Sequence, residues 1–303
     1  MLCTARSTSG LFAGWPNSFT QGYWIPNDNP WLDEASTVAT PATTTMLDIA
    51  YGPDPAHRLD LRLPANADAP VIVYVHSGGW IGGDRSSVPD VVLRFIERGY
   101  AVASIDYRLA PEHTFPDPVR DVKRALRWLK DHGRDTGTID GDRMVLFGTS
   151  AGGHLAAFAA TTAGHYEPVD LPADLAAHDS TVAGVVSIAG PTDLASFIEH
   201  DHSWGPDLTT AFLGCDLCAP QLLTAASPLT HLHDELPPAY WAYGGADVVV
   251  ALEPQGLAIA EEWAAAAGPM MSWIDIVEDT DHGLVEPRVN TPWLDEFIDA
   301  AVR

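Results

Sequence analysis

The chain has 303 residues, of which 46% are apolar, so it can bury a sizeable core and is too hydrophobic to be disordered throughout. Its 41 acidic and 16 basic side chains give a formal net charge of −25. This charge argues against partners such as nucleic acid or anionic membrane surfaces, because binding to both relies on clustered lysines and arginines.

Residues 1–43 combine several prolines with several aromatic residues, which predicts an N-terminal arm that packs on the main body. The arm either covers the core or forms one wall of a substrate pocket. The first 20 residues make a poor signal peptide, and no apolar run approaches the ~18 residues of a membrane span. We therefore expect a cytoplasmic protein.

Beyond the arm, strand-like and helix-like segments alternate. The strand-like segments are 44–51, 59–63, 71–76, 101–105, 144–148, 182–188, 239–243 and 271–277. The helix-like segments are 88–98, 118–132, 154–163, 254–267 and 292–302. Two hairpin-like strands followed by this alternation predict an α/β protein with a mostly parallel, doubly wound sheet of eight strands. We expect a single domain over residues 1–303.

Residues 190–238 interrupt the alternation, and long insertions between the strands of a sheet usually carry function. The segment predicts a lid of short helices over the active-site end of the sheet. It contains Cys215 and Cys218, whose spacing fits either a disulfide or, with nearby histidines, a zinc site. We favour the disulfide and expect no metal.

The strongest catalytic signal is the G-x-S-x-G motif at Gly148–Gly152, which lies between an apolar strand and a helix. A sharp strand-to-helix turn exposes the serine oxygen at the carboxyl edge of the sheet, and glycines on either side avoid clashes with the neighbouring chain. Ser150 is therefore the candidate nucleophile, and the amide of Ala151 faces the same space.

A second signal is the sequence H-S-G-G-W at His76–Trp80, which follows the third predicted strand. Acyl transfer needs N–H donors directed at the oxyanion of the tetrahedral intermediate, and glycines let the backbone approach it closely. Gly78 and Gly79, joined by Ala151, are the candidate oxyanion-hole donors.

Three further motifs follow in order: Y-R-L-A-P-E-H at Tyr107–His113, then Phe115-Pro116, then A-L-R-W-L at Ala125–Leu129. With these motifs the chain resembles the α/β-hydrolase fold esterases of the hormone-sensitive-lipase-like group, in the branch of bacterial esterases and feruloyl- or acetyl-esterase-like proteins. The resemblance runs from about residue 59 to 297 and implies serine esterase chemistry without a cofactor. Two positions depart from the family pattern, Ser77 in place of the first glycine of H-G-G-G and Thr149 in place of the common aspartate.

The family order Ser…Asp…His implies an acid after the seventh strand and a base after the eighth. Asp247 and His282 stand at these places. The resemblance therefore implies that His282 is the general base for Ser150 and that Asp247 orients it. The competing acids, which we interpret as loop charge, are Asp275, Asp279 and Asp281.

The resemblance implies a carboxylesterase that acts on small or short-acyl esters through an acyl-Ser150 intermediate, with Trp80 as part of the substrate pocket. We expect His154 to cap or pack. A homodimer is left open.

An arylformamidase-type amide hydrolase, acting on a substrate such as N-formylkynurenine, would use the same triad and a similar H-G-G-x-W loop. A catalytically silent binding protein on this fold is a further alternative, against which the intact set of three residues argues.

Overall fold

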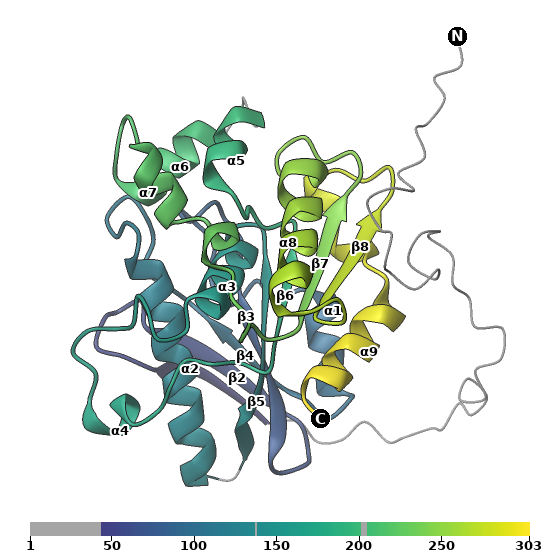
Figure 1. The fold of residues 1–303 in the computed structure, drawn as a ribbon. Coiled ribbons are helices and arrows are strands. Elements are labelled where there is room, and N and C mark those ends of the chain that lie inside the picture. Colours follow the sequence, from purple (N-terminus) through teal and green to yellow (C-terminus); the bar gives the residue numbers. More distant parts are fainter. Residues whose placement is uncertain (1–43, 137, 201–204) are drawn as a thin grey trace, which may run out of the picture. The chain divides into compact units, whose positions relative to one another are not determined.

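Eight strands of the described residues form one sheet in the order β1-β2-β4-β3-β5-β6-β7-β8 (Figure 1). This computed structural model describes residues 44–136, 138–200 and 205–303, so the predicted arm at 1–43 lies outside the described residues. The strands are β1 Thr44–Ala50, β2 Arg58–Leu63, β3 Ala69–Val75, β4 Ala101–Ile105, β5 Ile139–Thr149, β6 Gly184–Ile188, β7 Ala239–Gly244 and β8 Ser272–Val277. β2 pairs antiparallel with β1 and β4, and all other neighbours in the sheet are parallel. The prediction of a mostly parallel sheet of eight strands is confirmed.

Helices cover both faces of this sheet, and the central strands are apolar on both faces for that reason. The helices are α1 Asp90–Leu93, α2 Asp117–Thr136, α3 Ala151–Thr161, α4 Ala173–Ala176, α5 Leu194–His200, α6 Gly205–Leu213, α7 Pro220–Ala225, α8 Ala258–Ala267 and α9 Thr291–Ala301. In β3, Val71, Val73 and Val75 join the core under α2, α3 and α8, whereas Ile72 and Tyr74 join the core under α1 and α9. Alternate residues of one strand therefore fill two different cores.

Most predicted segments match the observed ones to within a few residues, but two helices are broken. The expected helix 88–98 becomes α1 and a 3₁₀ turn, Arg94–Ile96. The expected helix 254–267 begins as a π-helical turn at Leu252–Leu257 and continues as α8. The short helix α4 was not predicted.

The segment 190–238, which we call the cap segment, contains α5, α6 and α7 between β6 and β7. Figure 1 shows these three helices together beyond the carboxyl ends of the central strands. Cys215 and Cys218 form a disulfide between α6 and α7, with an S–S distance of 1.98 Å. Among the described residues, no group of three or more His, Cys, Asp and Glu side chains could hold a metal ion. No described helix is both long and apolar enough to span a bilayer.

The excess of acidic side chains predicts that salt stabilises this fold. The 41 acidic residues outnumber the 16 basic ones by 25, and this excess of negative charge repels itself in the folded state. Salt at 1 M shortens the screening length to about 3 Å, from about 10 Å at 0.1 M. We expect the melting temperature to rise by about 2 °C or more between 0.1 M and 1 M NaCl, which corresponds to about 1 kcal/mol for a chain of this length. Differential scanning calorimetry in NaCl and KCl measures this, and a flat or falling melting temperature would contradict it.

Candidate active site

Ser150 lies in a sharp turn between β5 and α3, with φ of 53° and ψ of −120°. Its amide donates to the carbonyl of Ile188 at 2.8 Å, which fixes the turn against β6. A Cβ on Gly148 would lie 2.1 Å from the oxygen of Gly152, and a Cβ on Gly152 would lie 2.0 Å from the oxygen of Val75. Both glycines of the motif are therefore required by contact with neighbouring backbone, as the motif predicted.

Replacing Gly152 with alanine is expected to destabilise the protein by about 3 kcal/mol or more, because the backbone that the new methyl group meets cannot move aside cheaply. Urea denaturation of the two proteins measures the change. Gly283→Ala is the matched control, since its added Cβ meets no atom within 4 Å. Equal stability of Gly152→Ala and the wild type would show that this close packing is wrong.

A chain of hydrogen bonds links the three residues that the family order selected. Ser150 Oγ lies 2.9 Å from His282 Nε2, and His282 Nδ1 lies 2.9 Å from Asp247 Oδ2. The amides of Val249 and Val250 both donate to Asp247 Oδ1 at 2.8 Å. Because the carboxylate accepts the Nδ1 proton, Nε2 is left free to accept a proton from the serine. The arrangement has the connectivity that nucleophilic acyl transfer requires.

Among the described residues, the side-chain hydrogen bonds of His282 go to Asp247 and Ser150 and not to the competing acids. Asp279 and Asp281 are exposed. The interpretation of Asp275 as loop charge was wrong, because this residue is 7% exposed within β8 and accepts hydrogen bonds from Tyr240 Oη at 2.9 Å and from the amide of Asn290 at 2.6 Å. Burial raises the pKa of the Asp275 carboxyl above its ordinary value. Asp275 of β8 therefore connects this strand by hydrogen bonds to β7 and to the start of α9.

The loop after β3 turns back on itself through three successive residues with positive φ. The φ angles are 122° at Gly78, 61° at Gly79 and 62° at Trp80. The amides of Ile81 and Gly82 close the turn by donating to the carbonyl of Gly78 at 3.2 and 3.0 Å. A bulky residue such as tryptophan rarely adopts a positive φ. The loop that holds Trp80 in this conformation forms one wall of the site.

Three backbone amides beside Ser150 have no acceptor within the described part of the chain: those of Gly78, Gly79 and Ala151. All three residues border the same cavity as Ser150. Free amides around a nucleophile are the groups that stabilise an oxyanion. Ser77 is not among the residues with positive φ, so the loop accommodates a side chain where the family usually has glycine.

The cavity at this place has a volume of about 270 Å³ and lies at the carboxyl edge of the sheet. The other residues that line it are Ser77, Trp80, Ile81, Pro191, Phe197, Leu208, Val249, Val250 and His282. Trp80 borders the cavity as expected, but its side chain is only 1% exposed and stacks on Phe212 with ring centroids 4.7 Å apart. Phe197 of α5 and Leu208 of α6 bring the cap segment into the wall.

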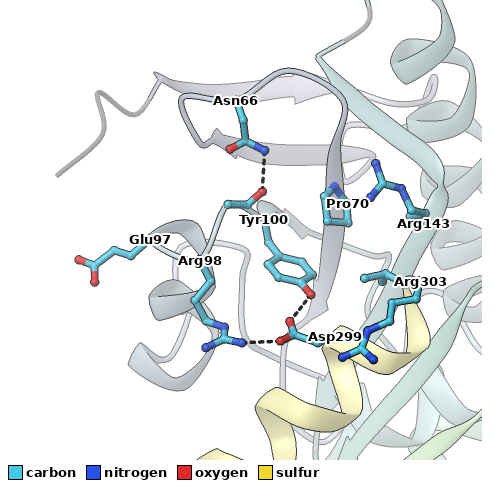
Figure 2. A pocket seen from close by; sticks show the side chains of 10 residues that line it. Asn66, Pro70, Glu97, Arg98, Tyr100, Arg143, Asp299 and Arg303 are labelled. Carbon is cyan, nitrogen blue, oxygen red and sulfur yellow. Dashed lines mark hydrogen bonds and ion pairs between the residues drawn. The ribbon is translucent and has the colours of Figure 1, made fainter. Parts of the chain in front are cut away.

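A larger cavity, of about 790 Å³, lies at the opposite edge of the sheet, where β3 and β4 begin (Figure 2). Tyr100 Oη and Arg98 both donate to the carboxylate of Asp299 there, at 2.6 and 2.8 Å. None of the residues that line this cavity is a serine, cysteine or histidine. Its lining therefore lacks a serine or cysteine beside a histidine, and the smaller cavity, which has Ser150 and His282, is the candidate active site.

The sequence did not single out Glu286, which connects the two loops that carry Ser150 and His282. Thr149 Oγ1 donates to Glu286 Oε2 at 2.9 Å. Burial raises the pKa of the Glu286 carboxyl above its ordinary value. Thr149, which stands where the family commonly has aspartate, therefore connects the nucleophile turn to the segment that follows His282.

Comparison with known proteins identifies the family of this chain. The family model BD-FAE matches residues 59–261. The chain belongs to the BD-FAE family. The match confirms the resemblance to the hormone-sensitive-lipase-like esterases.

Two curated relatives from Mycobacterium tuberculosis carry esterase names. Esterase LipQ is 35% identical over 211 residues, which cover 67% of this chain and 49% of the relative. Esterase LipC is 30% identical over 238 residues, which cover 75% of this chain and 57% of the relative. This chain therefore spans about half the length of these relatives.

Solved structures confirm the α/β-hydrolase fold. A truncated carbohydrate esterase from gut microbiota superposes with a TM-score of 0.74 at 22% identity, covering 87% of this chain and 97% of the other. Esterase B from Lactobacillus rhamnosis superposes with a TM-score of 0.66 at 21% identity, covering 86% and 87%.

Proposed function

We propose that this protein is a serine carboxylic-ester hydrolase that acts on small or short-acyl esters through an acyl-Ser150 intermediate. The observation that carries the proposal is the hydrogen-bonded chain from Ser150 through His282 to Asp247, beside three backbone amides that have no acceptor in the described part of the chain. The esterase names of the curated relatives support ester hydrolysis and do not favour the formamidase alternative.

In the first half of the reaction, Ser150 Oγ attacks the ester carbonyl carbon and its proton passes to His282 Nε2. The carbonyl electron pair moves to oxygen, and the amides of Gly78, Gly79 and Ala151 donate to the oxyanion, each contributing about 3 kcal/mol. Asp247 accepts the Nδ1 proton and stabilises the imidazolium. When the intermediate collapses, the C–O bond to the alcohol breaks and His282 Nε2 protonates the leaving oxygen.

In the second half, water attacks the acyl carbon of acyl-Ser150 and gives one proton to His282 Nε2. Collapse of the second intermediate releases the carboxylic acid, and Ser150 Oγ recovers its proton from the imidazolium. The same side chains serve both halves, so the proposed reaction needs no co-reactant other than water.

The lining of the cavity supports an uncharged acyl group. Its side chains are apolar apart from those of Ser77, Ser150 and His282. An apolar wall gains from contact with alkyl or aromatic carbon and offers a carboxylate or phosphate no partner. The net charge of −25 also repels polyanionic esters.

A series of p-nitrophenyl esters from acetyl to decanoyl tests the proposal. We expect the largest kcat/KM at acetyl to butyryl, with a steady fall at longer chains, because the cavity of about 270 Å³ is small. N-formylkynurenine is assayed in parallel and should be the poorer substrate. A maximum at long chains would contradict the short-acyl preference, and faster turnover of the formamide would contradict ester hydrolysis as the main activity.

A further inference from the structure

Trp80 holds an unusual backbone conformation in the middle of the candidate oxyanion loop. Its φ is 62°, and it directly follows Gly78 and Gly79, which line the cavity. A bulky residue in the left-handed region persists only where its surroundings hold it there. The shape of the loop, and with it the direction of the Gly79 amide, therefore depends on what holds the Trp80 side chain.

The indole of Trp80 is held on its face and at its nitrogen. Its face stacks on Phe212 of α6 at an interplanar angle of 21°. Its Nε1 donates to His154 Nδ1 at 3.2 Å, between two side chains that are 1% and 0% exposed. Stacking alone lets a ring slide in its own plane, whereas the hydrogen bond from Nε1 also fixes its rotation.

The partners of His154 determine its tautomer. Its Nε2 lies 2.9 Å from the carbonyl oxygen of Ala226, which can only accept, so Nε2 carries the proton. Nδ1 is then left as an acceptor, and the indole N–H of Trp80 is the donor that it needs. Burial lowers the pKa of His154 to about 4, which keeps the ring in this neutral form at neutral pH.

His154 therefore joins three parts of the site. It lies on α3, four residues after Ser150, and its own amide donates to the Ser150 carbonyl at 3.0 Å. Its ring contacts the oxyanion loop through Trp80 and the cap segment through Ala226. We propose that His154 is a positioning residue that holds the oxyanion loop in its active shape through the indole of Trp80. This inference rests on the proposed esterase function.

The two variants that remove the hydrogen bond are Trp80→Phe and His154→Phe, each of which keeps an aromatic ring in the core. His154→Asn is the conservative variant, because its side-chain oxygen can accept the indole proton near the place of Nδ1. Trp263→Phe is the matched control. Trp263 is a buried tryptophan of α8 whose Nε1 donates to the carbonyl of Pro237 at 3.0 Å, so the control also loses a buried indole hydrogen bond.

The measurements are kcat and KM for p-nitrophenyl acetate, the inhibition constant of 1,1,1-trifluorobutan-2-one, and the melting temperature. This ketone reports on the oxyanion loop, because Ser150 Oγ adds to its carbonyl carbon, the proton passes to His282, and the resulting oxyanion occupies the same place as in ester hydrolysis. We expect Trp80→Phe and His154→Phe to lower kcat by about 10- to 100-fold and to raise the inhibition constant of the ketone by a similar factor. Both variants should keep KM within about threefold of the wild-type value. His154→Asn should recover most of kcat.

Loss of stability without loss of function would overturn the inference. If Trp80→Phe and His154→Phe lower the melting temperature as Trp263→Phe does, while kcat and the ketone affinity stay at the wild-type values, His154 only packs. If His154→Phe does not fold, Trp80→Phe and His154→Asn decide by the same readouts. A wild-type protein that hydrolyses no p-nitrophenyl ester would instead overturn the proposed function, so the two failures are distinguishable.

Discussion

Replacing Ser150 with alanine is expected to lower kcat for p-nitrophenyl acetate by about 10⁶-fold, to the level that the remaining groups of the site can support. The physical reason is that, among the described residues, Ser150 is the one nucleophilic side chain within hydrogen-bond reach of His282 Nε2, so the variant cannot form the acyl intermediate there. The free amides of Gly78, Gly79 and Ala151 remain in place, so the variant still binds ester and folds.

Initial rates and the mass of the protein after treatment with a fluorophosphonate measure this result. The wild type should gain one covalent adduct on Ser150, and Ser150→Ala should gain none. Ser77→Ala is the matched control, because Ser77 lines the same cavity and its hydroxyl does not contact His282. It should keep its labelling and lose less than about tenfold in kcat. Activity that survives in Ser150→Ala would show that Ser150 is not the nucleophile.

The sequence predicted the framework of the site because the framework depends on local patterns. A strand, a sharp turn and a helix follow one another within 144–163, and the glycines of that turn are required by contacts that hold wherever this motif occurs. Since parallel strands present their carboxyl ends at one edge, the segments after β3, β5, β7 and β8 had to converge. The positions of Ser150, Asp247 and His282 follow from this convergence.

What the sequence could not show are side-chain contacts between segments that lie far apart in the chain. Thr149 and Glu286 are 137 residues apart, and nothing in their local sequence indicates the bond between them. The same holds for Trp80 and His154, which are 74 residues apart. Asp275 was interpreted as loop charge because it is close in sequence to His282, and only its contacts with Tyr240 and Asn290 explain its burial.

The broken helices have a similar origin. A run of apolar residues at helical spacing predicts that 88–98 faces a core, and Val91, Val92 and Phe95 do so. It does not predict where the backbone changes from α to 3₁₀ geometry, because the two forms differ by little in energy and bury nearly the same side chains over a few residues. The face that is buried is therefore easier to predict than the ends of the helix.

Asp247→Asn is expected to lower kcat by about 10⁴-fold with little change in KM or stability. The amides of Val249 and Val250 both donate to Asp247 Oδ1, so the asparagine oxygen will take the place of Oδ1 and its NH₂ group will face His282 Nδ1. A donor at that place requires Nδ1 to accept, and the proton of the neutral imidazole then moves to Nε2. In this tautomer His282 cannot accept the proton of Ser150, although every heavy atom is in position.

The controls for Asp247→Asn are Asp279→Asn and Asp281→Asn, which remove the same charge from exposed positions of the loop before His282. These two variants measure what an exposed negative charge in the histidine loop contributes to activity, which solvent screening keeps small. The tautomer argument predicts that the two exposed variants stay within about threefold of the wild type. A loss of less than about tenfold in Asp247→Asn would refute the assignment of Asp247, and a loss confined to Asp281→Asn would transfer the role to that residue.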